Sequence, residues 1–387
     1  EISLLHAKFL PFLSFNTYIY IFLKSLNLSL KKTIIKNKKS AIIKMGKRDL
    51  DQKKNPRKKK KRVKERYELL KSDLNPKVEG ISSLMDIVQK VVEYKNIDKS
   101  VLHNIFPQLL ELNMVIGMES LKKTLFYQIL YFIQRLDLRG GDGEYLHTVL
   151  TGPPGCGKTT VAKIIGDLYS NLGILSDKKL FRVAKREDFV AEYLGQTAIK
   201  TKKLLKSCLG GVLFIDEVYA LGPGESNKDS FSKEAIDTIN VFLSENKNNF
   251  CCIIAGYEDK IKNCFFNVNP GLERRFQWVH NIEPYSNEQL AEIFYKMVRD
   301  VDWEILVEKP YLVKIIDKNK ELFKHAGGSI ETFLSKCKIS HAKRVFSLDE
   351  RHKFVITEDD IDNAFEIINS NKLYIQIEDT TPLSFYM

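Results

Sequence analysis

The chain has 387 residues, which is long enough for two compact domains with a sizeable core. Hydrophobic residues make up 44% and charged residues 28%, proportions that exclude a fully disordered or collagen-like chain. The net charge of +12 belongs to the N-terminus, because residues 1–80 hold 22 Lys and Arg against 7 Asp and Glu. The remaining residues hold 39 against 42, so overall charge gives them no tendency to bind polyanions.

The N-terminal 44 residues precede the first methionine, Met45. They are rich in Ile, Leu, Phe, Lys, Asn and Ser, as translated AT-rich untranslated sequence would be, so we expect the natural start at Met45. A membrane segment is the alternative, because residues 9–23 carry no charge. This stretch contains Pro11 and Asn16 and is shorter than the roughly 20 residues that span a bilayer, so we expect no membrane insertion.

Residues 45–80 form a basic arm, in which residues 53–64 read KKNPRKKKKRVK. This run is too charged to join a core, so we expect a disordered, solvated arm. It could be a solubilising or nonspecific polyanion-binding arm, a nuclear-localisation signal or a contact to nucleic-acid phosphates. The six cysteines form no CxxC pair or zinc pattern, which fits reduced thiols in the cytoplasm or nucleus.

Apolar residues between Leu84 and Val92 recur at helical spacing, and a second helix is predicted at residues 118–135. Apolar runs at residues 146–150, 180–183, 212–215 and 250–255 then predict buried strands. They alternate with predicted helices near residues 158–172, 197–208 and 230–244. This alternation predicts an α/β fold with a parallel sheet flanked by helices.

Beyond Tyr285 the pattern becomes helical, near residues 287–300, 310–323, 329–345 and 358–369, with Thr357 as an N-cap. We therefore expect a small all-α lid domain after the sheet. The predicted boundaries are a non-native leader or hydrophobic extension at 1–44, the basic arm at 45–80, a helical extension at 81–104, the α/β nucleotide-binding domain at 105–285, the lid at 286–370 and a tail at 371–387.

A phosphate-binding motif links the first strand to the next helix. Residues 152–159 read GPPGCGKT and fit GxxxxGK[ST]. Glycines let the backbone N–H groups surround phosphates, and the helix N-terminus adds partial positive charge. Lys158 is expected to contact the β- and γ-phosphates of ATP, and the Thr159 hydroxyl to bind Mg²⁺. The predicted nucleotide-binding residues of this motif are Pro154, Gly155, Cys156, Gly157, Lys158, Thr159 and Thr160.

Two carboxylates end the strand at residues 212–215. In a parallel sheet, Asp216 and Glu217 emerge at the same edge as the phosphate loop. Asp216 is expected to hold Mg²⁺ through water, and Glu217 to act as general base toward the attacking water. Two acids at this position could instead simply begin the next helix.

Together these motifs resemble the AAA+ ATPases, and within them the CbbX/SpoVK (CfxQ-like) group, which includes the red-type Rubisco activase. The resemblance covers about residues 105–370. Besides the two motifs above, it rests on Val115-Ile116-Gly117, Tyr193-Leu194-Gly195-Gln196-Thr197, Glu234-Ala235-Ile236-Asp237-Thr238, Ala255-Gly256-Tyr257 and Asn269-Pro270-Gly271-Leu272 leading to Arg274-Arg275-Phe276. Membership implies a homo-oligomeric ring, a hexamer, with ATP between neighbouring subunits.

The resemblance also implies roles for single residues. Ile116 and Gly117 are expected to contact adenine, with ordinary core packing as the alternative. Arg275 is expected to be an arginine finger toward the neighbour's γ-phosphate, with Arg274 as its helper; one of the two could be a surface salt-bridge residue. Tyr193, followed by Leu194 and Gly195, is expected to grip a polypeptide client in the central pore, because apolar contact does not depend on sequence. Residues 222–227 are expected to form a second pore loop.

Two departures from the family pattern affect the predicted sensors. Tyr257 stands where relatives hold a polar sensor, often asparagine, and could hydrogen-bond a water or phosphate. Gly327 and Gly328 stand in the region where many relatives supply a nucleotide-sensing arginine. Lys336 could substitute, or the two glycines could form a turn before a helix.

The function predicted from the sequence is a ring-forming ATPase that remodels or threads a protein client through its pore. Two alternatives remain open, a nucleic-acid motor or loader using the basic arm, and a scaffold whose assembly is gated by nucleotide. Glu192 beside Tyr193 argues against a phosphate track in the pore.

Overall fold

The computed structural model describes residues 78–89, 97–139, 144–193, 195–222 and 229–380. The chain divides into two compact units, Glu1–Glu79 and Gly80–Met387, and the fold below is that of the second unit. The predicted leader and the basic run at residues 53–64 lie outside the described residues. No described helix is both long and apolar enough to cross a membrane.

Three helices precede the sheet: α4 (Ile81–Gln89), α5 (Lys99–Asn113) and α6 (Glu119–Ile133), followed by a 3-10 turn, η3 (Leu136–Arg139). Helices α4 and α6 agree with the predicted ones. Helix α5 is hidden in the sequence because Pro107 lies inside it, where proline normally interrupts a helix. The Asp98 side chain caps α5 by accepting the Ser100 N–H at 2.9 Å.

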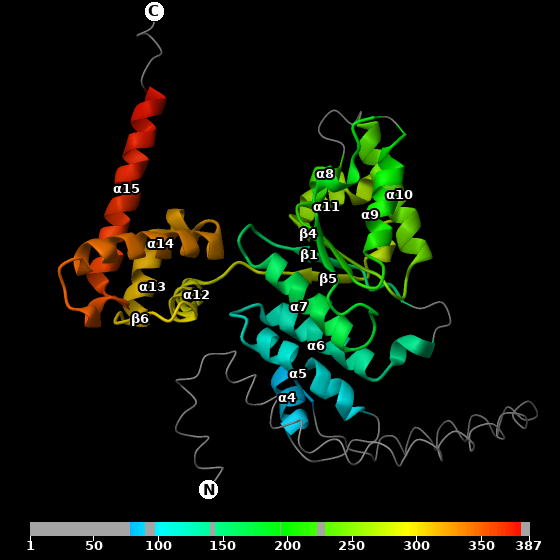
Figure 1. The fold of residues 1–387 in the computed structure, drawn as a ribbon, viewed down its shortest axis with the longest axis horizontal. Helices are drawn as coiled ribbons and strands as arrows, with labels where there is room; N and C mark the ends of the chain where they lie inside the picture. Colours follow the sequence, from blue (N-terminus) through cyan, green and yellow to red (C-terminus); the bar gives the residue numbers. More distant parts are fainter. Residues whose placement is uncertain (1–77, 90–96, 140–143, 194, 223–228, 381–387) are drawn as a thin grey trace, which may run out of the picture. The chain divides into compact units, whose positions relative to one another are not determined.

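Five parallel strands form the central sheet in the order β2-β3-β4-β1-β5 (Figure 1). They are β1 (Thr148–Thr151), β2 (Phe181–Ala184), β3 (Val212–Ile215), β4 (Cys251–Gly256) and β5 (Trp278–Asn281). Strand β1 pairs with β4 on one side and with β5 on the other. The predicted parallel sheet is therefore confirmed, and the segments that follow the strands leave it at one edge.

Helices cover both faces of the sheet. Helix α7 (Lys158–Asn171) packs on one face, where Gly166 lets it approach the side chains of Val212 and Phe181. Helices α9 (Thr197–Ser207) and α10 (Ser230–Glu245) share a core with Leu213 and Ile215, which face the other way because side chains alternate along a strand. Short elements complete this domain: α8 (Arg186–Phe189), η4 (Val218–Leu221), α11 (Glu258–Cys264), η5 (Phe266–Val268) and η6 (Glu273–Arg275).

Two strands differ from the sequence prediction. The predicted buried strand at residues 180–183 is β2, whose Arg182 and Val183 side chains are exposed because β2 lies at an edge of the sheet. Strand β5, at the other edge, is not evident from the sequence. Its four residues read WVHN and alternate in burial, so they lack the apolar run that marks the inner strands.

The lid domain comprises α12 (Asn287–Asp300), α13 (Lys309–Lys318), η7 (Lys320–Phe323), α14 (Ala326–Val345), η8 (Glu350–His352) and α15 (Glu358–Thr380). The helical lid is thus confirmed. It also contains a parallel pair of two-residue strands, β6 (Glu304–Ile305) and β7 (Val355–Ile356), which are too short to give a sequence signal. Its core is apolar, and the ring of Phe333 contacts those of both Phe294 and Phe365.

A buried ion pair joins two lid helices. Asp360 of α15 is fully buried and accepts two hydrogen bonds from Arg344 of α14, each 2.8 Å long. The N–H of Thr357 donates to the same carboxylate at 3.0 Å, and Nδ1 of His341 lies 3.2 Å from it. Burial raises the pKa of Asp360, but these hydrogen bonds outweigh burial and hold the pKa below its usual value. Asp360 is therefore charged and fully paired.

Replacing Asp360 with asparagine should destabilise the lid, because Arg344 would lose its partner while staying partly buried. We expect Asp360→Asn to lower the free energy of unfolding by about 3 kcal/mol. Urea unfolding followed by tryptophan fluorescence, to which Trp303 of the lid contributes, measures this change. Asp349→Asn, which removes an exposed ion pair with Arg351, is the matched control and should leave the unfolding curve unchanged. Equal curves for the two variants would contradict the assignment.

Candidate nucleotide-binding and hydrolysis site

The loop between β1 and α7 encloses the side chain of Lys158. Gly155 and Gly157 have φ values of +72° and +87°, which a side chain would strain. Lys158, the first residue of α7, is 7% exposed, and its Nζ donates to the carbonyl oxygens of Gly152 at 3.1 Å and Pro153 at 2.8 Å. The ammonium group thus lies inside the loop, paired with backbone oxygens that phosphate oxygens can replace.

The other predicted residues of the phosphate loop differ in exposure. Cys156 is buried, Pro154 and Thr159 are half-buried, and Thr160 is exposed. Burial raises the pKa of the Cys156 thiol, so this cysteine is a neutral packing residue. The hydroxyl of Tyr285 donates to the Cys156 carbonyl at 3.2 Å, and burial raises the pKa of Tyr285 to about 12. A neutral phenol from the start of the lid segment therefore holds the loop.

The lid also contacts the phosphate loop through backbone atoms. A Cβ atom at Gly155 would lie 1.9 Å from the carbonyl oxygen of His325, and the Gly327 N–H donates to the Gly155 carbonyl at 3.0 Å. Because α14 begins at Ala326, Gly327 and Gly328 form its first turn, and the alternative of a turn before the helix is wrong. Lys336, two turns further on, is half-buried and lines a lid pocket of about 350 Å³ with His325 and Ser329.

The two predicted acids follow β3 directly and are both half-buried. The Oδ1 atom of Asp216 accepts the backbone N–H of Glu217 at 3.0 Å, and Glu217 has a φ of +51°. Burial, and next the negative charge of Asp216, raise the pKa of Glu217, while Lys158 and Lys260 lower it in part. Glu217 is consequently a stronger base than an ordinary glutamate and lies within electrostatic reach of the phosphate-loop lysine.

Tyr257 directly follows β4 and has a cationic neighbour, Lys260, that sequence reasoning missed. Its ring centroid lies 6.2 Å from that of Tyr219, in η4 just after Glu217. The Lys260 Nζ lies 4.9 Å from the Tyr219 centroid and 5.1 Å from the Tyr257 centroid, within cation–π range. The only available signal was the position of Lys260 one helical turn after Tyr257, which many surface lysines share.

The segment before α6 lies between the phosphate loop and the lid. Gly117 has a φ of +66°, and a Cβ atom there would lie 2.8 Å from the Nε2 atom of Gln289 on α12. The neighbouring Met118 places its Cε atom 3.4 Å from where a Gly157 Cβ would be. Ile116 is half-buried. This placement suits the expected contact of Ile116 and Gly117 with a base, because α6 begins beside the loop that takes the phosphates.

The predicted arginine finger belongs to a segment that packs on α10; we call residues 269–275 the arginine loop. Arg275 is half-buried, and its Nε donates to the Ser244 hydroxyl at 2.7 Å, while its Nη1 donates to the Gly271 carbonyl. Arg274 is exposed. The hydrogen bonds of Arg275 thus keep it on its own loop and helix α10, and do not bring it to the Lys158 side chain.

The predicted pore residues lie in residues 190–196, here called the client loop. Tyr193 is 67% exposed, Gly195 has a φ of +80°, and Leu194 lies outside the described residues. The base of the loop is closed by the N–H of Ala191, which donates to the Thr197 hydroxyl at 3.1 Å. A fixed base thus presents an exposed aromatic ring. Residues 223–228, most of the predicted second pore loop, are outside the described residues.

A dedicated metal site is absent from the described residues, where no three His, Cys, Asp or Glu side chains come together as ligands. Thr159 and Asp216 fit a Mg²⁺ ion that arrives with a nucleotide, because such an ion takes one or two protein ligands and completes its octahedron with phosphates and water. The half-buried positions of both side chains are consistent with this role.

Comparisons with known proteins agree with this geometry. A model of the AAA family, described as ATPases associated with various cellular activities, matches residues 148–283. A cfxQ-like protein of Acanthamoeba polyphaga mimivirus is 40% identical over 253 residues, which cover 65% of this chain and 61% of that protein. Stage V sporulation protein K of Bacillus subtilis is 38% identical over 208 residues, covering 53% and 63%. The chain therefore spans somewhat less than two thirds of the length of these two relatives.

Protein CbbX of Cereibacter sphaeroides is 37% identical over 226 residues, which cover 56% of this chain and 71% of CbbX. Among solved structures, the AAA domain of FIGL-1 in complex with ADP superimposes with a TM-score of 0.50 at 16% identity, covering 80% of this chain and all of that domain, so it supports the fold alone. The resemblance found in the motifs is confirmed, and the chain belongs to the CbbX, CfxQ and SpoVK group of AAA ATPases.

Proposed function

We propose that this protein hydrolyses ATP in a ring of identical subunits and uses the cycle to remodel a polypeptide client. The observation that carries the proposal is the burial of Lys158 inside the phosphate loop, within electrostatic reach of a glutamate whose pKa is raised. A buried cation beside a strong base suits a site that binds polyphosphate and activates water.

The residues of one subunit divide the work. Lys158 exchanges its bonds to the Gly152 and Pro153 carbonyls for bonds to the β- and γ-phosphate oxygens. Thr159 and Asp216 hold the bound Mg²⁺, which neutralises charge on these phosphates. Glu217 orients the attacking water and accepts its proton. Ile116 and Gly117 contact the base. Lys260, which lies over the ring of Tyr257, is within electrostatic reach of Glu217.

The neighbouring subunit supplies the remaining positive charge. We assign this role to Arg275, which adjoins the buried Phe276, with Arg274 as its helper. In the free subunit Arg275 is bonded to Ser244 and Gly271, so the interface has to offer it a better acceptor, and a γ-phosphate is such an acceptor.

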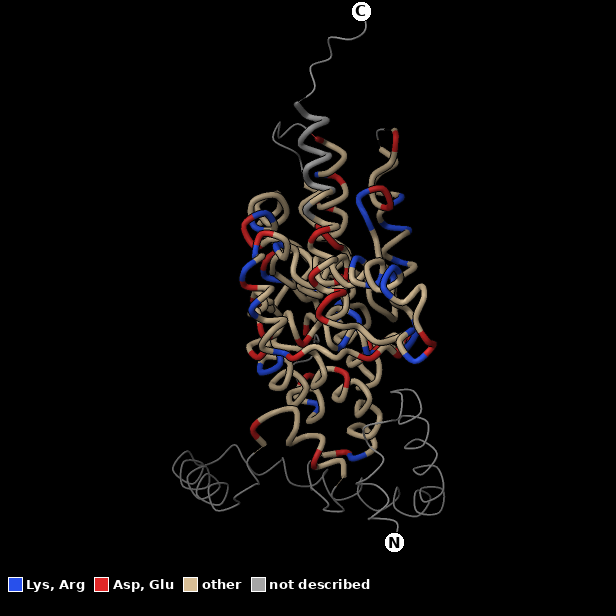
Figure 2. The backbone as a smooth tube through the Cα atoms, turned by 90° about the vertical axis from the view of Figure 1, so that its left-hand side faces the viewer, with Lys and Arg blue, Asp and Glu red and all other residues tan. Residues whose placement is uncertain are grey.

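A protein client is favoured over a nucleic acid by the surface of the described residues. Residues 81–387 hold 39 Lys and Arg against 42 Asp and Glu, and Figure 2 shows both kinds along much of the described backbone. Tyr193 offers an exposed ring next to Glu192, a combination that suits an extended polypeptide better than a phosphate chain. We propose that Tyr193 contacts the client in the pore of the ring.

Two inactive variants should restore each other's activity if the site is shared. Glu217→Gln should lower kcat by about 10² to 10⁴ through loss of the base. Arg275→Ala should lower kcat by about 10³ or more through loss of the finger. Mixed in equal amounts, they form sites that join the intact glutamate of one subunit to the intact arginine of the next, so steady-state ATP hydrolysis should reappear. Arg299→Ala, at an exposed lid arginine, is the control; mixtures as inactive as their components would contradict the shared site.

The pH profile of hydrolysis should report Glu217. Its raised pKa places the acid limb of kcat above the ordinary glutamate value of about 4.3, and activity is lost as pH falls through the raised pKa. Lys260 lowers this pKa, so Lys260→Gln should move the acid limb of kcat to higher pH, by less at high salt. The control is Lys262→Gln, one turn from the same site. Identical acid limbs for the native protein and Lys260→Gln would count against Glu217 as the titrating base.

Tyr193 should matter for client binding and not for hydrolysis itself. In the Glu217→Gln background, which retains ATP, Tyr193→Ala should weaken the binding of casein, used as an unfolded polypeptide probe, by about tenfold or more. Tyr193→Phe keeps the apolar ring and should bind casein normally. Fluorescence anisotropy of labelled casein gives both affinities. Unchanged binding with Tyr193→Ala, together with normal basal hydrolysis in the otherwise native chain, would favour a nucleotide-gated scaffold.

A further inference from the structure

Helix α10 contacts the client loop through Glu234. The Oε1 atom of Glu234 accepts the backbone N–H of Ala198 at 3.2 Å. Ala198 lies in the first turn of α9, where N–H groups have no partner within the helix and where a carboxylate is favoured by the helix dipole. The side chain of Gln196, the N-cap residue of α9, forms no capping hydrogen bond with this turn. A carboxylate from α10 therefore holds the helix start from which the client loop emerges.

The client loop is firmly joined to this first turn of α9. Thr197 accepts the Ala191 N–H across the loop, and the Thr201 hydroxyl donates to the Phe189 carbonyl at 3.1 Å. The Lys200 Nζ donates to the Val190 carbonyl at 2.8 Å. A displacement of the start of α9 is consequently passed to both ends of the loop that presents Tyr193.

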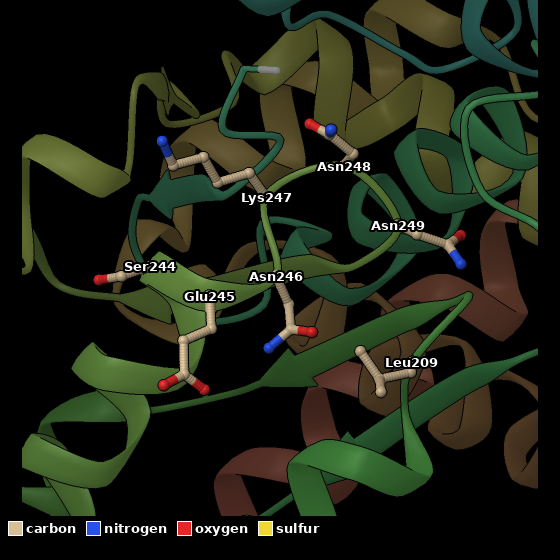
Figure 3. Close-up of a pocket in the computed structure, with 7 residues that line it drawn as sticks. All are labelled: Leu209, Ser244, Glu245, Asn246, Lys247, Asn248 and Asn249. Carbon is tan, nitrogen blue, oxygen red and sulfur yellow. The ribbon is translucent and has the colours of Figure 1, made fainter. Parts of the chain in front are cut away.

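The next turn of α10 contacts the arginine loop. The Asn269 side-chain amide donates to Asp237 Oδ1 at 2.8 Å, and Asn269 Oδ1 in turn accepts the Gly271 N–H at 3.0 Å. At the end of α10, the Ser244 hydroxyl accepts a hydrogen bond from the guanidinium of Arg275. Figure 3 shows Ser244 at the close of the helix, on the border of a polar pocket of about 400 Å³ formed with residues 245–249 and Leu209.

The helix approaches the arginine loop closely between these two contacts. A Cβ atom at Gly271 would lie 3.3 Å from the Asn240 Nδ2 atom and 3.0 Å from the Arg275 Nη1 atom. The Asn240 Oδ1 atom is buried and has no hydrogen-bond partner. The side-chain amide of Asn240 therefore lies close to Gly271 of the arginine loop.

The first turn of α10 is tied to the segment that follows Glu217. Asp229, the N-cap, forms an ion pair with Arg186 of α8, and Arg186 also donates to the Ser232 hydroxyl at 2.7 Å and to the Ala220 carbonyl at 2.8 Å. Ala220 belongs to η4, three residues after the predicted base. Helix α10 thus contacts the start of α9 and the arginine loop directly, and it is linked through Arg186 to η4, which follows Glu217.

Helix α10 is built to move as one body. It has 16 residues, about 24 Å at 1.5 Å per residue, with no Gly or Pro. Its inner side, including Ala235, Ile236, Ile239 and Leu243, is completely buried in the core beneath the sheet. Close packing of this kind transmits displacement instead of absorbing it.

We propose that α10 couples the client loop of each subunit to the arginine that the same subunit presents to its neighbour, with Glu234 and Asp237 as positioning residues. The proposal rests on the proposed function, since it needs Arg275 to act on the neighbouring ATP. It follows that a client held by Tyr193 in one subunit alters hydrolysis in the next subunit. Coupling between sites is reciprocal, so ATP at that interface alters the client loop in return.

Hydrogen exchange measures this reciprocal effect without a known client. In the Glu217→Gln protein, peptides covering residues 190–201 and 266–276 should exchange differently with ATP and with ADP, by about fivefold or more. Glu234→Ala added to this background should abolish the difference in residues 190–201 and keep it in residues 266–276. Asp237→Ala should abolish it in residues 190–201 and at least weaken it in residues 266–276. Lys233→Ala, exposed on the same turn, is the control and should change neither.

A charge exchange separates coupling from simple stability. Asp237→Asn alone keeps an acceptor oxygen without its charge and should weaken the ATP-dependent difference, whereas Asn269→Asp alone places two carboxylates together and should abolish it. The double variant restores an amide–carboxylate pair with reversed roles and should recover it. A purely structural role would raise exchange equally with ATP and ADP and leave their ratio unchanged. If Glu234→Ala does not fold, Glu234→Gln, which keeps an acceptor oxygen without its charge, should reduce the ratio in the same peptide.

Two results would overturn the proposal: retention of the full difference at residues 190–201 in Glu234→Ala and Asp237→Ala, or no difference there in the Glu217→Gln protein itself. Mixing Glu217→Gln and Arg275→Ala subunits tests the shared site independently of the exchange measurements. If mixing restores hydrolysis and the exchange difference is missing, the shared site stands and α10 is not its link to the client loop. If mixing fails as well, the proposed function fails.

Discussion

The parallel pairing of β1 through β4 is the constraint on which the candidate site depends. Because these strands run in one direction, the phosphate loop after β1, the client loop after β2, the two acids after β3 and Tyr257 after β4 all leave the sheet at one edge. The order β2-β3-β4-β1-β5 further places β4 between the acids and the phosphate loop. Segments from four distant parts of the sequence thus start from the same edge of the sheet because of the strand pairing alone.

The lid depends on a second constraint, the absence of a side chain at Gly155. Any Cβ atom there would collide with the His325 carbonyl, so glycine is needed both for the loop conformation and for the approach of α14. The contact consists of a backbone hydrogen bond from Gly327, and the first turn of α14 offers no arginine. In this chain the lid accordingly meets the phosphate loop through N–H and C=O groups, and the Tyr285 hydroxyl adds a side-chain bond from the same side.

Much of this arrangement was predictable from local patterns. The inner strands β1, β3 and β4 are apolar runs, and Gly152 to Thr159 has a spacing that few other structures require, so the sheet and the phosphate loop could be located from the sequence. Edge strand β5 and helix α5 could not, because alternating burial and an internal proline hide their periodicity. Lys260 was missed for another reason. Its importance comes from the rings of Tyr219, in η4, and Tyr257, after β4, which only the folded chain brings around its ammonium group.

The motif at residues 234–238 illustrates why a recognisable pattern need not reveal its own purpose. On α10, Ala235 and Ile236 pack into the core. Glu234 accepts a hydrogen bond from the start of α9, and Asp237 accepts one from the arginine loop, so the motif combines core residues with residues that bind neighbouring segments. Both acids are half-buried and each accepts from an amide, and neither is near enough to the phosphate loop to have been suspected of chemistry. Their spacing of three residues places both acids on the same side of α10, about one turn apart, so this side of the helix contacts two loops. In the ring that we propose, α10 is the element that contacts both the start of α9, beside Tyr193, and the loop that carries Arg275.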